Sequence, residues 1–337
     1  MSRTRAHTHS LRVVTYNILL GGARREEHIS AVLRRADADV IALQEVNNPE
    51  FATRLARELH MELLIGVASD GTGLNIAILS RLPVRRWHNQ THRGRMLRSH
   101  LEADVATGGA RVPELRIHAV HLAARFGERN KGEARRLREL AALLGDIGDA
   151  SGTAHLVAGD FNGLAPGDHL EATAFFARMA ELRKARALVR HPSGLVGPRP
   201  AHSADAEREI EEAWLAVGVD PRLDVGIPVL PFPVYPLTAL LPRSAAVDRL
   251  LGRTIPRATV ARMLEAGYID SFRRLHPRAT GYTCATWMPA ARVDYVFADP
   301  VLAAGLTHCE VIGSRRRPDH EALVASDHFP VVAEFEV

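Results

Sequence analysis

The chain has 337 residues, of which 46% are hydrophobic, so it is long enough to bury the core of one large domain or of two modest ones. Its formal charge of +4 is too small to indicate nucleic-acid binding by itself, and its two cysteines exclude a disulfide framework and a Cys-x-x-Cys zinc site. Nearly all cationic residues are arginines, whose guanidinium groups suit phosphate binding. A GC-rich genome would also produce a high arginine content.

The first apolar segment, residues 11–20, contains Arg12, Thr15 and Asn17, so it is typical of a strand and not of a signal peptide. No run reaches the roughly 18 apolar residues that a membrane-spanning helix needs. The nearest candidate, residues 225–241, is interrupted by four prolines. With two cysteines and no such segments, we expect a cytoplasmic protein.

In chain order, short β-rich runs alternate at first with amphipathic stretches. The pattern predicts strands over 11–19 and 40–43 and helices over 27–36 and 49–59. Closely spaced strands then follow over 61–67, 74–80, 84–88, 97–105 and 115–122. This close spacing favours hairpins and antiparallel pairing.

A long helix is predicted over 128–144, a strand over 154–158, and three further strands over 293–297, 306–312 and 329–337. Because both halves of the chain run from strands to helices to strands, we expect an α/β fold in which two sheets pack face to face with helices outside.

Prolines crowd residues 190–257, where a helix over 204–217 is the main regular element predicted. We interpret this region as an insertion within a single domain spanning residues 1–337, because it is short and poor in strand signals. Its apolar stretch, residues 227–241, could serve as a lid, a partner surface or a packed arm. The packed arm is favoured, because exposed apolar patches of that size are uncommon.

Five fragments place polar residues at the edges of strongly apolar runs. They are Thr15-Tyr16-Asn17, Leu43-Gln44-Glu45, Gly159-Asp160-Phe161-Asn162, Arg292-Val293-Asp294-Tyr295 and Ser326-Asp327-His328. A buried strand cannot hide an ionised carboxylate without a partner, so Asp160 should face a cation, a charged neighbour or solvent. Taken singly, each fragment is compatible with ordinary turn chemistry. Together they predict one active site.

The predicted site is rich in hard oxygen ligands, which suit Mg²⁺, Mn²⁺ or Ca²⁺ rather than zinc or copper. Glu45 is the best ligand candidate. His328 could accept a proton or bind a phosphate oxygen, with an acid holding its second nitrogen. His121 ends another strand, and alternation along that strand places His121 and His118 on opposite faces, so only one of them should enter the site.

In the order and content of these five motifs, the sequence resembles the endonuclease/exonuclease/phosphatase superfamily, from residue 11 to residue 337 apart from the insertion. The resemblance implies a four-layered α/β sandwich of two packed, mostly antiparallel mixed sheets flanked by helices. It also implies divalent-metal-dependent hydrolysis of a phosphate ester.

By motif position, the resemblance implies metal-site roles for Asn17, Glu45 and Asp327. It makes Asp160 the residue that orients or deprotonates the attacking water, with Asn162 holding phosphate or fixing that geometry. His121 matches a phosphate-stabilising position, Asp294 an acid that orients a histidine, and His328 the catalytic histidine. Arg98 lies where some nucleases place a phosphate-contacting arginine, and Asn75 matches a segment that supports the site.

The substrate is left open between nucleic acid, a phospholipid head group, an inositol phosphate and another metabolite. A nuclease is favoured narrowly, because arginines that could track a nucleic-acid backbone cluster at positions 93, 95, 98, 125 and 129. A phospholipid or small-molecule phosphodiesterase or phosphatase is the first alternative, in which residues 227–241 could contact a membrane surface. An inactive protein that binds a phosphorylated partner is the second. Retention of mutually repelling acids argues against it.

Overall fold

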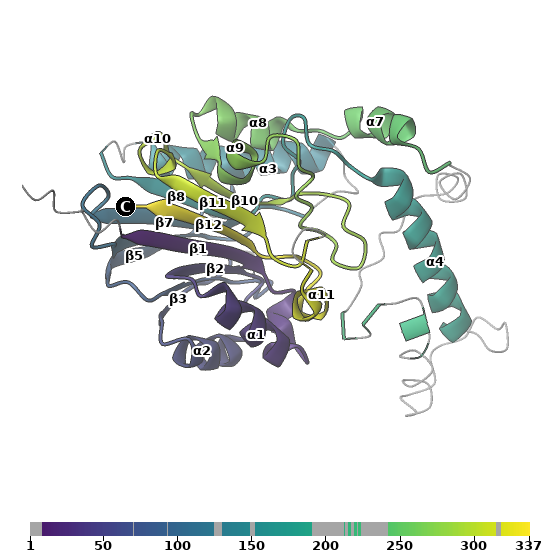
Figure 1. Cartoon of the computed structure of the whole chain (residues 1–337), viewed down its shortest axis with the longest axis horizontal. Coiled ribbons are helices and arrows are strands. Elements are labelled where there is room, and N and C mark those ends of the chain that lie inside the picture. The colour runs from purple at the N-terminus through teal and green to yellow at the C-terminus, as the bar shows by residue number, and fades with distance from the viewer. Residues whose placement is uncertain are drawn as a thin grey trace, which may run out of the picture.

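The computed structural model of the chain describes residues 9–69, 71–92, 94–124, 130–148, 152–190, 212, 215–216, 219–220, 222–223, 242–314 and 318–337. In this part of the chain two β-sheets lie face to face and helices cover their outer sides (Figure 1). The four-layered α/β sandwich predicted from the sequence is confirmed.

The first sheet contains six strands in the order β11-β12-β1-β2-β4-β3. In chain order they are β1 (Ser10–Asn17), β2 (Val40–Gln44), β3 (Glu62–Gly66), β4 (Ile76–Ser80), β11 (Leu306–Val311) and β12 (Val331–Glu336). β1 and β2 are parallel, and the other neighbours are antiparallel. All five residues of β2 are buried, as expected of a central strand that is covered on both faces.

The second sheet repeats this plan with six strands in the order β5-β6-β7-β8-β10-β9. They are β5 (Val84–Gln90), β6 (His100–Ala106), β7 (Glu114–His121), β8 (His155–Asp160), β9 (Ile269–Asp270) and β10 (Asp294–Ala298). β7 and β8 form the parallel pair, flanked by antiparallel neighbours. Parallel strands end at the same edge of a sheet, so each sheet brings two strand ends together at its centre.

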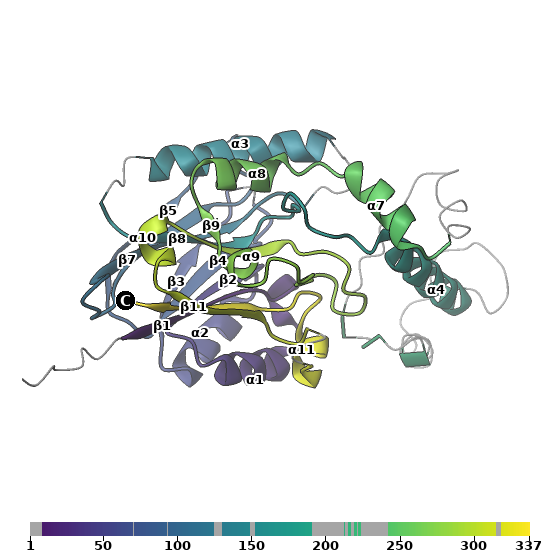
Figure 2. The same ribbon diagram turned by 45° about the horizontal axis from the view of Figure 1, so that its top comes forward.

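Helices α1 (Glu26–Ala36) and α2 (Pro49–Glu58) cover the first sheet, and α3 (Asn130–Ile147) and α8 (Ala258–Glu265) cover the second (Figure 2). Strand alternation divides the core accordingly. Ile117 and Ala119 of β7 belong to the core between the sheets, whereas Val120 packs with residues of α3 and α8.

The shorter or peripheral helices are η1 (Leu20–Gly22), α4 (Ala172–Arg190), α7 (Ala245–Arg253), α9 (Ser271–Leu275), α10 (Pro300–Ala303) and α11 (His320–Ala325). In Figures 1 and 2, α4 and α7 lie beyond the end of the sheets at which β1 ends, with α11 nearer to that end. No helix within the described ranges combines the length and the apolar character needed to cross a membrane.

Several predicted bounds differ from the observed ones. β6 begins at His100 instead of residue 97, which leaves Arg98 in the preceding loop, and β8 extends to Asp160. Helices α4 and α7 to α11 were not predicted. α7 lies inside the Pro-rich region 190–257, where Ser244 caps it by accepting a hydrogen bond from the amide of Ala246 at 3.2 Å. Of the predicted helix over 204–217, the structure describes only residues 212, 215 and 216, and the apolar stretch 227–241 lies outside the described residues.

Candidate active site

Strand register brings three of the predicted residues into one row across the second sheet. Asp160, the last residue of β8, is the register partner of His121 on β7 and of Asp294 on β10. All three side chains are buried, with at most 1% of each residue exposed. Two carboxylates and an imidazole therefore meet at the centre of this sheet edge.

Asn17 links this row to the first sheet. Its side-chain amide donates to Asp160 Oδ2 at 3.2 Å and lies 3.3 Å from Glu45 Oε1. Glu45 follows β2 directly, and its second carboxylate oxygen accepts a hydrogen bond from the amide of Leu20 at 2.9 Å. Because β1 and β2 are parallel neighbours, Asn17 and Glu45 leave the first sheet at adjacent strand ends.

His328 completes the cluster from the loop that follows α11. Its Nδ1 donates to Asp294 Oδ2 at 2.8 Å, which turns Nε2 toward Asp160 Oδ2, 3.9 Å away. Ser326 fixes this loop, because its hydroxyl donates to the carbonyl of Asn17 at 2.7 Å. Glu45 and Asp327 are only half buried, so they lie at the mouth of the site above the buried row.

Burial and neighbouring charges perturb the ionisation of these groups. Burial, reinforced by the charge of Asp294, raises the pKa of Asp160 from 3.8 to about 7. Burial alone would lower the pKa of His328, but Asp294 and the other nearby anionic groups raise it well above its usual value. For His121, burial and the nearby cation Arg98 lower the pKa, so its ring is neutral at pH 7.

Two site residues adopt backbone conformations that are uncommon for side chains with a Cβ atom. Glu45 has φ of 62° and Asn162 has φ of 47°. Asn162 is held there because its amide donates to Asp160 Oδ1 at 2.8 Å and its side chain donates to the carbonyl of Leu122 at 2.9 Å. Sparsely populated conformations of this kind cluster at functional sites, where the surrounding structure enforces them.

The donor set suits a hard divalent cation. Both ring nitrogens of His121 and Oδ1 of Asp294 are buried without a hydrogen-bond partner among the described residues. His121 Nε2 lies 3.5 Å from Asp160 Oδ2 and 4.0 Å from Glu45 Oε1. Cys284 lies close to Asp327 and His328, and burial raises the pKa of its thiol to about 11, so the metal-free thiol is protonated at neutral pH. Carboxylate oxygens therefore dominate the site, with the imidazoles of His121 and His328 beside them.

Arg98 and Asn75 occupy different positions relative to this cluster. Arg98 Nη1 donates to the carbonyl of Leu122 at 3.3 Å, the same oxygen that Asn162 uses, and its Nε has no partner in the described part. Asn75 supports the Glu45 loop, because its carbonyl accepts from the amide of Val46 at 2.8 Å. Its side-chain oxygen accepts from the amide of Ala68, so that oxygen is already engaged.

His118 does not enter the site. It lies on the opposite face of β7 and contacts His100 at 2.8 Å. Of the arginines predicted to form a basic track, Arg98 lines the site and Arg95 is exposed on the preceding loop, whereas positions 93, 125 and 129 lie outside the described residues.

Two supporting residues were not predicted. The Thr283 hydroxyl accepts from the amides of Val293 and Asp294 at 3.0 and 3.2 Å. Arg25 donates to the carbonyls of Leu19 and Ala325 at 2.6 and 2.5 Å, which ties the end of β1 to α11. Neither residue lies in a distinctive sequence pattern, whereas Ser326 belongs to a fragment already singled out.

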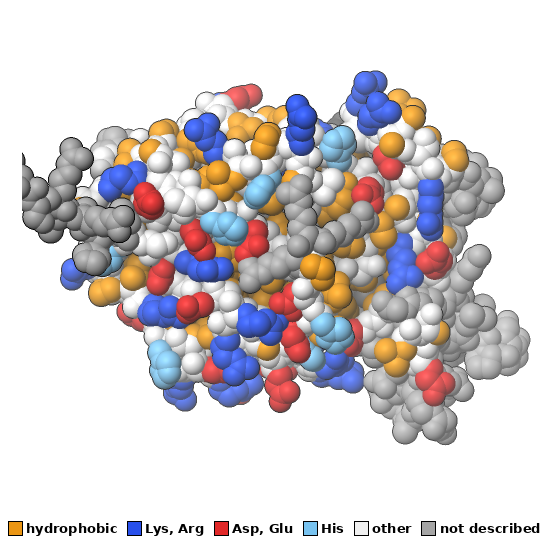
Figure 3. All heavy atoms as spheres, viewed as in Figure 1, with side chains coloured by type: hydrophobic (Ala, Val, Ile, Leu, Met, Phe, Trp, Pro, Cys, Tyr) orange, Lys and Arg blue, Asp and Glu red, His pale blue; other side chains and the backbone are white. Residues whose placement is uncertain are grey.

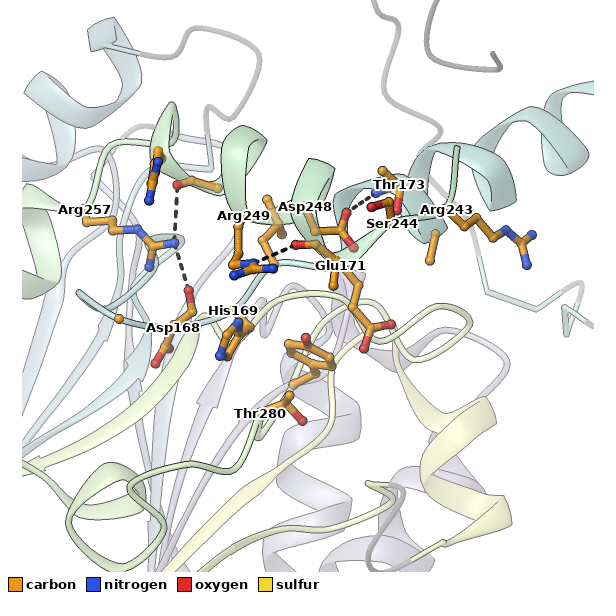
Figure 4. Close-up of a pocket in the computed structure, with 17 residues that line it drawn as sticks. Asp168, His169, Glu171, Thr173, Arg243, Ser244, Asp248, Arg249, Arg257 and Thr280 are labelled. Carbon is orange, nitrogen blue, oxygen red and sulfur yellow. Dashed lines mark hydrogen bonds between the residues drawn. The ribbon is translucent and has the colours of Figure 1, made fainter. Parts of the chain in front are cut away.

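A cavity of about 710 Å³ opens beside this region. One wall consists of residues shortly after Asn162, including His169, and another of Asp248 and Arg249 from α7, while Thr280 lies below (Figure 4). Arg243, Arg253 and Arg257 also line it. Arg257 is engaged with backbone, since it donates to the carbonyl of Asp168 at 2.9 Å.

The sequence matches the model of the Endonuclease/Exonuclease/phosphatase family over residues 14–328. Comparison with curated proteins gives no match. Among solved structures, the chain is similar to an AP endonuclease from Archaeoglobus fulgidus, with 16% identity and a TM-score of 0.56, covering 97% of this chain and 100% of that one.

It is also similar to the 3' phosphatase NExo from Neisseria bound to a product DNA hairpin, with 17% identity and a TM-score of 0.54, covering 97% of this chain and 100% of that one. A third similar structure is humanized TDP2 of D. rerio, with 16% identity and a TM-score of 0.55, covering 98% of this chain and 100% of that one. At these identities the structures establish the fold, and the family match establishes membership. The chain belongs to the Endonuclease/Exonuclease/phosphatase family, whose members are phosphoesterase hydrolases.

Proposed function

We propose that the protein is a divalent-metal-dependent hydrolase that cleaves phosphodiester bonds in nucleic acid. The observation that carries this proposal is the position of His328 between two carboxylates. Its imidazole lies 2.8 Å from Asp294 and 3.9 Å from Asp160. A buried carboxylate and an imidazole side by side, both with raised pKa values, suit attack of water on phosphorus.

Both pKa values are raised, and the different charge types of the two groups separate the two roles. His328 keeps its proton at neutral pH, because its pKa is raised well above the usual value, so it donates to a phosphoryl oxygen rather than acting as the base. Asp160 has a pKa of about 7 and is therefore matched to accept the proton of the attacking water. As the water oxygen bonds to phosphorus, the bond from phosphorus to the leaving oxygen breaks.

Glu45, Asn17 and Asp327 would hold the cation at the mouth of the site, where Glu45 and Asp327 are accessible from solvent. When bound, Mg²⁺ or Mn²⁺ neutralises phosphate charge and stabilises the charge that develops on oxygen.

The preference for nucleic acid rests on cationic groups arranged around the site. Arg98 lies within it, and Arg243, Arg249 and Arg253 line the adjacent cavity, where they could contact further phosphates of an extended substrate. The overall charge does not carry this preference, because basic and acidic side chains are interspersed over the face seen in Figure 3.

The decisive assay offers the purified protein, with Mg²⁺ or Mn²⁺, single- and double-stranded oligonucleotides, sphingomyelin, inositol phosphates and an aryl phosphodiester. We expect oligonucleotide cleavage that chelation with EDTA abolishes and Mg²⁺ or Mn²⁺ restores. Asp160→Asn should lower kcat by about 10²–10⁴-fold, the range for loss of a general base, whereas the exposed Asp37→Asn control should not.

A second comparison tests the substrate class separately. The double variant Arg249→Ala/Arg253→Ala should raise KM for the oligonucleotide and leave the aryl phosphodiester unaffected, because only the longer substrate reaches the cavity. Cleavage confined to sphingomyelin, an inositol phosphate or the aryl ester would reject the nuclease and keep the phosphoesterase. Absence of turnover on every substrate would reject both.

A further inference from the structure

A second cluster of ligand-type side chains lies on the outer face of the second sheet, under α3. His92 comes from the turn after β5, His100 is the first residue of β6, and Asp146 lies near the end of α3. Asp146 Oδ2 is 2.6 Å from His92 Nε2 and 3.3 Å from His100 Nδ1, and the three atoms all lie within 4.8 Å of one another. The two ends of the loop between β5 and β6, together with the distant end of α3, thus direct two imidazole nitrogens and a carboxylate oxygen at one point.

The chemistry of this cluster differs from that of the active site. Two imidazoles and one carboxylate suit zinc and similar transition-metal ions, whereas magnesium prefers oxygen ligands. In a tetrahedral site with bonds of about 2.0–2.1 Å, neighbouring ligand atoms lie roughly 3.3 Å apart. The His100–Asp146 distance has this value, and the His92–Asp146 distance needs a change of well under about 1 Å.

A neighbouring residue orients one ligand of this cluster, and two of the ligands are accessible from solvent. The His100 side chain is fully buried, and its other nitrogen, Nε2, contacts His118 Nδ1 at 2.8 Å, which fixes the orientation of the ring. Glu102 Oε2 lies 3.8 Å from the same nitrogen of His118. His92 and Asp146 are 17% and 23% exposed, so an ion can enter and water can complete its coordination.

This position couples the cluster to the loop that carries Arg98. His92 and His100 bracket residues 93–99, and α3 already holds this loop through Glu139, whose carboxylate accepts from the amide of Leu97 at 3.0 Å. The same glutamate accepts from the amide of Ala123 at 2.8 Å, near the end of β7. An ion that joins both ends of the loop to Asp146 would restrict where Arg98 lies.

We propose that His92, His100 and Asp146 form a second metal site, which binds a zinc-type transition-metal ion and orders the Arg98 loop. The site is distinct from the oxygen-rich catalytic cluster, and it does not rest on the proposed nuclease activity. Its ligands are two imidazoles and one carboxylate, so binding leaves a net charge of about +1 at a position that is partly open to solvent.

The test is a Co²⁺ titration of the full-length, metal-stripped protein, followed by visible absorption, with Zn²⁺ competition. Tetrahedral Co²⁺ absorbs far more strongly than the octahedral ion that an oxygen-rich site would hold. We expect about one equivalent of strongly absorbing Co²⁺ that Zn²⁺ displaces, and slower amide hydrogen exchange over residues 94–100 when Zn²⁺ is bound.

Four variants make the test specific. His92→Ala and Asp146→Asn should each weaken Co²⁺ binding by about tenfold or more, whereas His88→Ala, an exposed histidine on β5 outside the cluster, should bind as the wild type does. Glu45→Ala should also retain the signal, because it alters the other site. Absence of the tetrahedral signal in the folded wild type, or equal loss in His88→Ala, would overturn the proposal.

Discussion

Asp160 and His328 are two buried groups whose ionisation depends on the same neighbouring acid, Asp294. The same Asp294 carboxylate raises both pKa values, since it disfavours a second negative charge on Asp160 and favours the positive charge on His328. Burial, the larger cause for Asp160, and the charge of Asp294 together raise the pKa of Asp160 to about 7, and Asp294 is the largest charge effect that raises the pKa of His328. This arrangement supports the opposite roles that we propose for the two groups, although both are buried at one strand edge.

The raised pKa of Asp160 predicts a pH-dependent cost to folding in the metal-free protein. The folded state holds the proton up to about pH 7, whereas the unfolded state releases it near pH 3.8, so the stabilisation is present at low pH and is lost as pH rises through about 7. Asp160→Asn cannot ionise. Relative to that variant, the wild type should lose about 2–3 kcal/mol of unfolding free energy between about pH 5 and about pH 7.5.

Urea denaturation in the presence of a chelator measures this difference. Asp37→Asn is the matched control, because the Asp37 side chain is 74% exposed, and its unfolding free energy should follow the wild type at both pH values. A constant difference between wild type and Asp160→Asn across this range would contradict the assigned pKa.

Asp294 is predicted to act through His328. In Asp294→Asn the carboxylate that raises the His328 pKa is gone, while burial, which lowers it, remains. The imidazolium should therefore lose its proton at lower pH, and the alkaline limb of the kcat/KM profile should move down by one pH unit or more. Glu62→Gln, an exposed acid on β3, should leave the profile in place. An unshifted limb in Asp294→Asn would disconnect Asp294 from the ionisation of His328.

At the scale of the elements, the sequence predicts the strand ends better than their arrangement. Acids and amides at the edges of apolar runs identify Asn17, Glu45 and Asp160, because such groups need polar or charged partners, which a strand end can reach and an apolar core cannot supply. The row from His121 through Asp160 to Asp294 could not be predicted, since periodicity specifies neither strand order nor register. Thr283 was missed for a related reason: its role is a hydrogen bond to a distant backbone, which leaves no local pattern.

Close approach of β7 and β8 requires glycine before Asp160. A Cβ atom on Gly159 would overlap the carbonyl group of Val120, so the two parallel strands would have to separate. Gly159→Ala should lower the unfolding free energy by about 1–3 kcal/mol and should also reduce turnover, because His121 and Asp160 are placed by this pairing. Thermal or urea unfolding together with steady-state rates measures both effects.

Gly145 supplies the control for this substitution. It lies within α3, and a Cβ atom added there would meet no neighbouring atom within 4 Å. Gly145→Ala should therefore stabilise the protein by about 0.4–1 kcal/mol, because alanine restricts the unfolded chain and favours the helix. If the two alanine variants behaved alike, close strand approach would not be what Gly159 provides.

At the scale of the whole molecule, the site lies where the two sheets meet, and segments from both ends of the chain assemble it. The sequence supports the prediction of one domain, because the motifs extend from Asn17 to His328. What the sequence does not reveal is how the loops around the site are fixed to each other. Arg292 performs this task from a fully buried position, two residues before Asp294.

Arg292 joins two acids from different segments. Its Nε donates to Asp168 Oδ2 at 2.9 Å, and its Nη1 and Nη2 donate to the two carboxylate oxygens of Asp270 at 2.9 and 2.6 Å. The three side chains are between 1% and 5% exposed. Arg292→Leu leaves two carboxylates buried without this partner, so the unfolding free energy should fall by about 3–5 kcal/mol. Arg292→Lys should recover little, because an ammonium group cannot pair with both acids in this forked geometry.

Urea unfolding should show this loss in a single transition, because Asp168, Asp270 and Arg292 belong to one cooperative unit if the chain is one domain. Arg262→Ala removes an exposed ion pair to Glu265, with side chains 59% and 64% exposed, and should cost less than about 1 kcal/mol. Two separate transitions would contradict the single-domain prediction. Equal, small losses in Arg292→Leu and Arg262→Ala would show that the buried cluster does not hold the loops around the site.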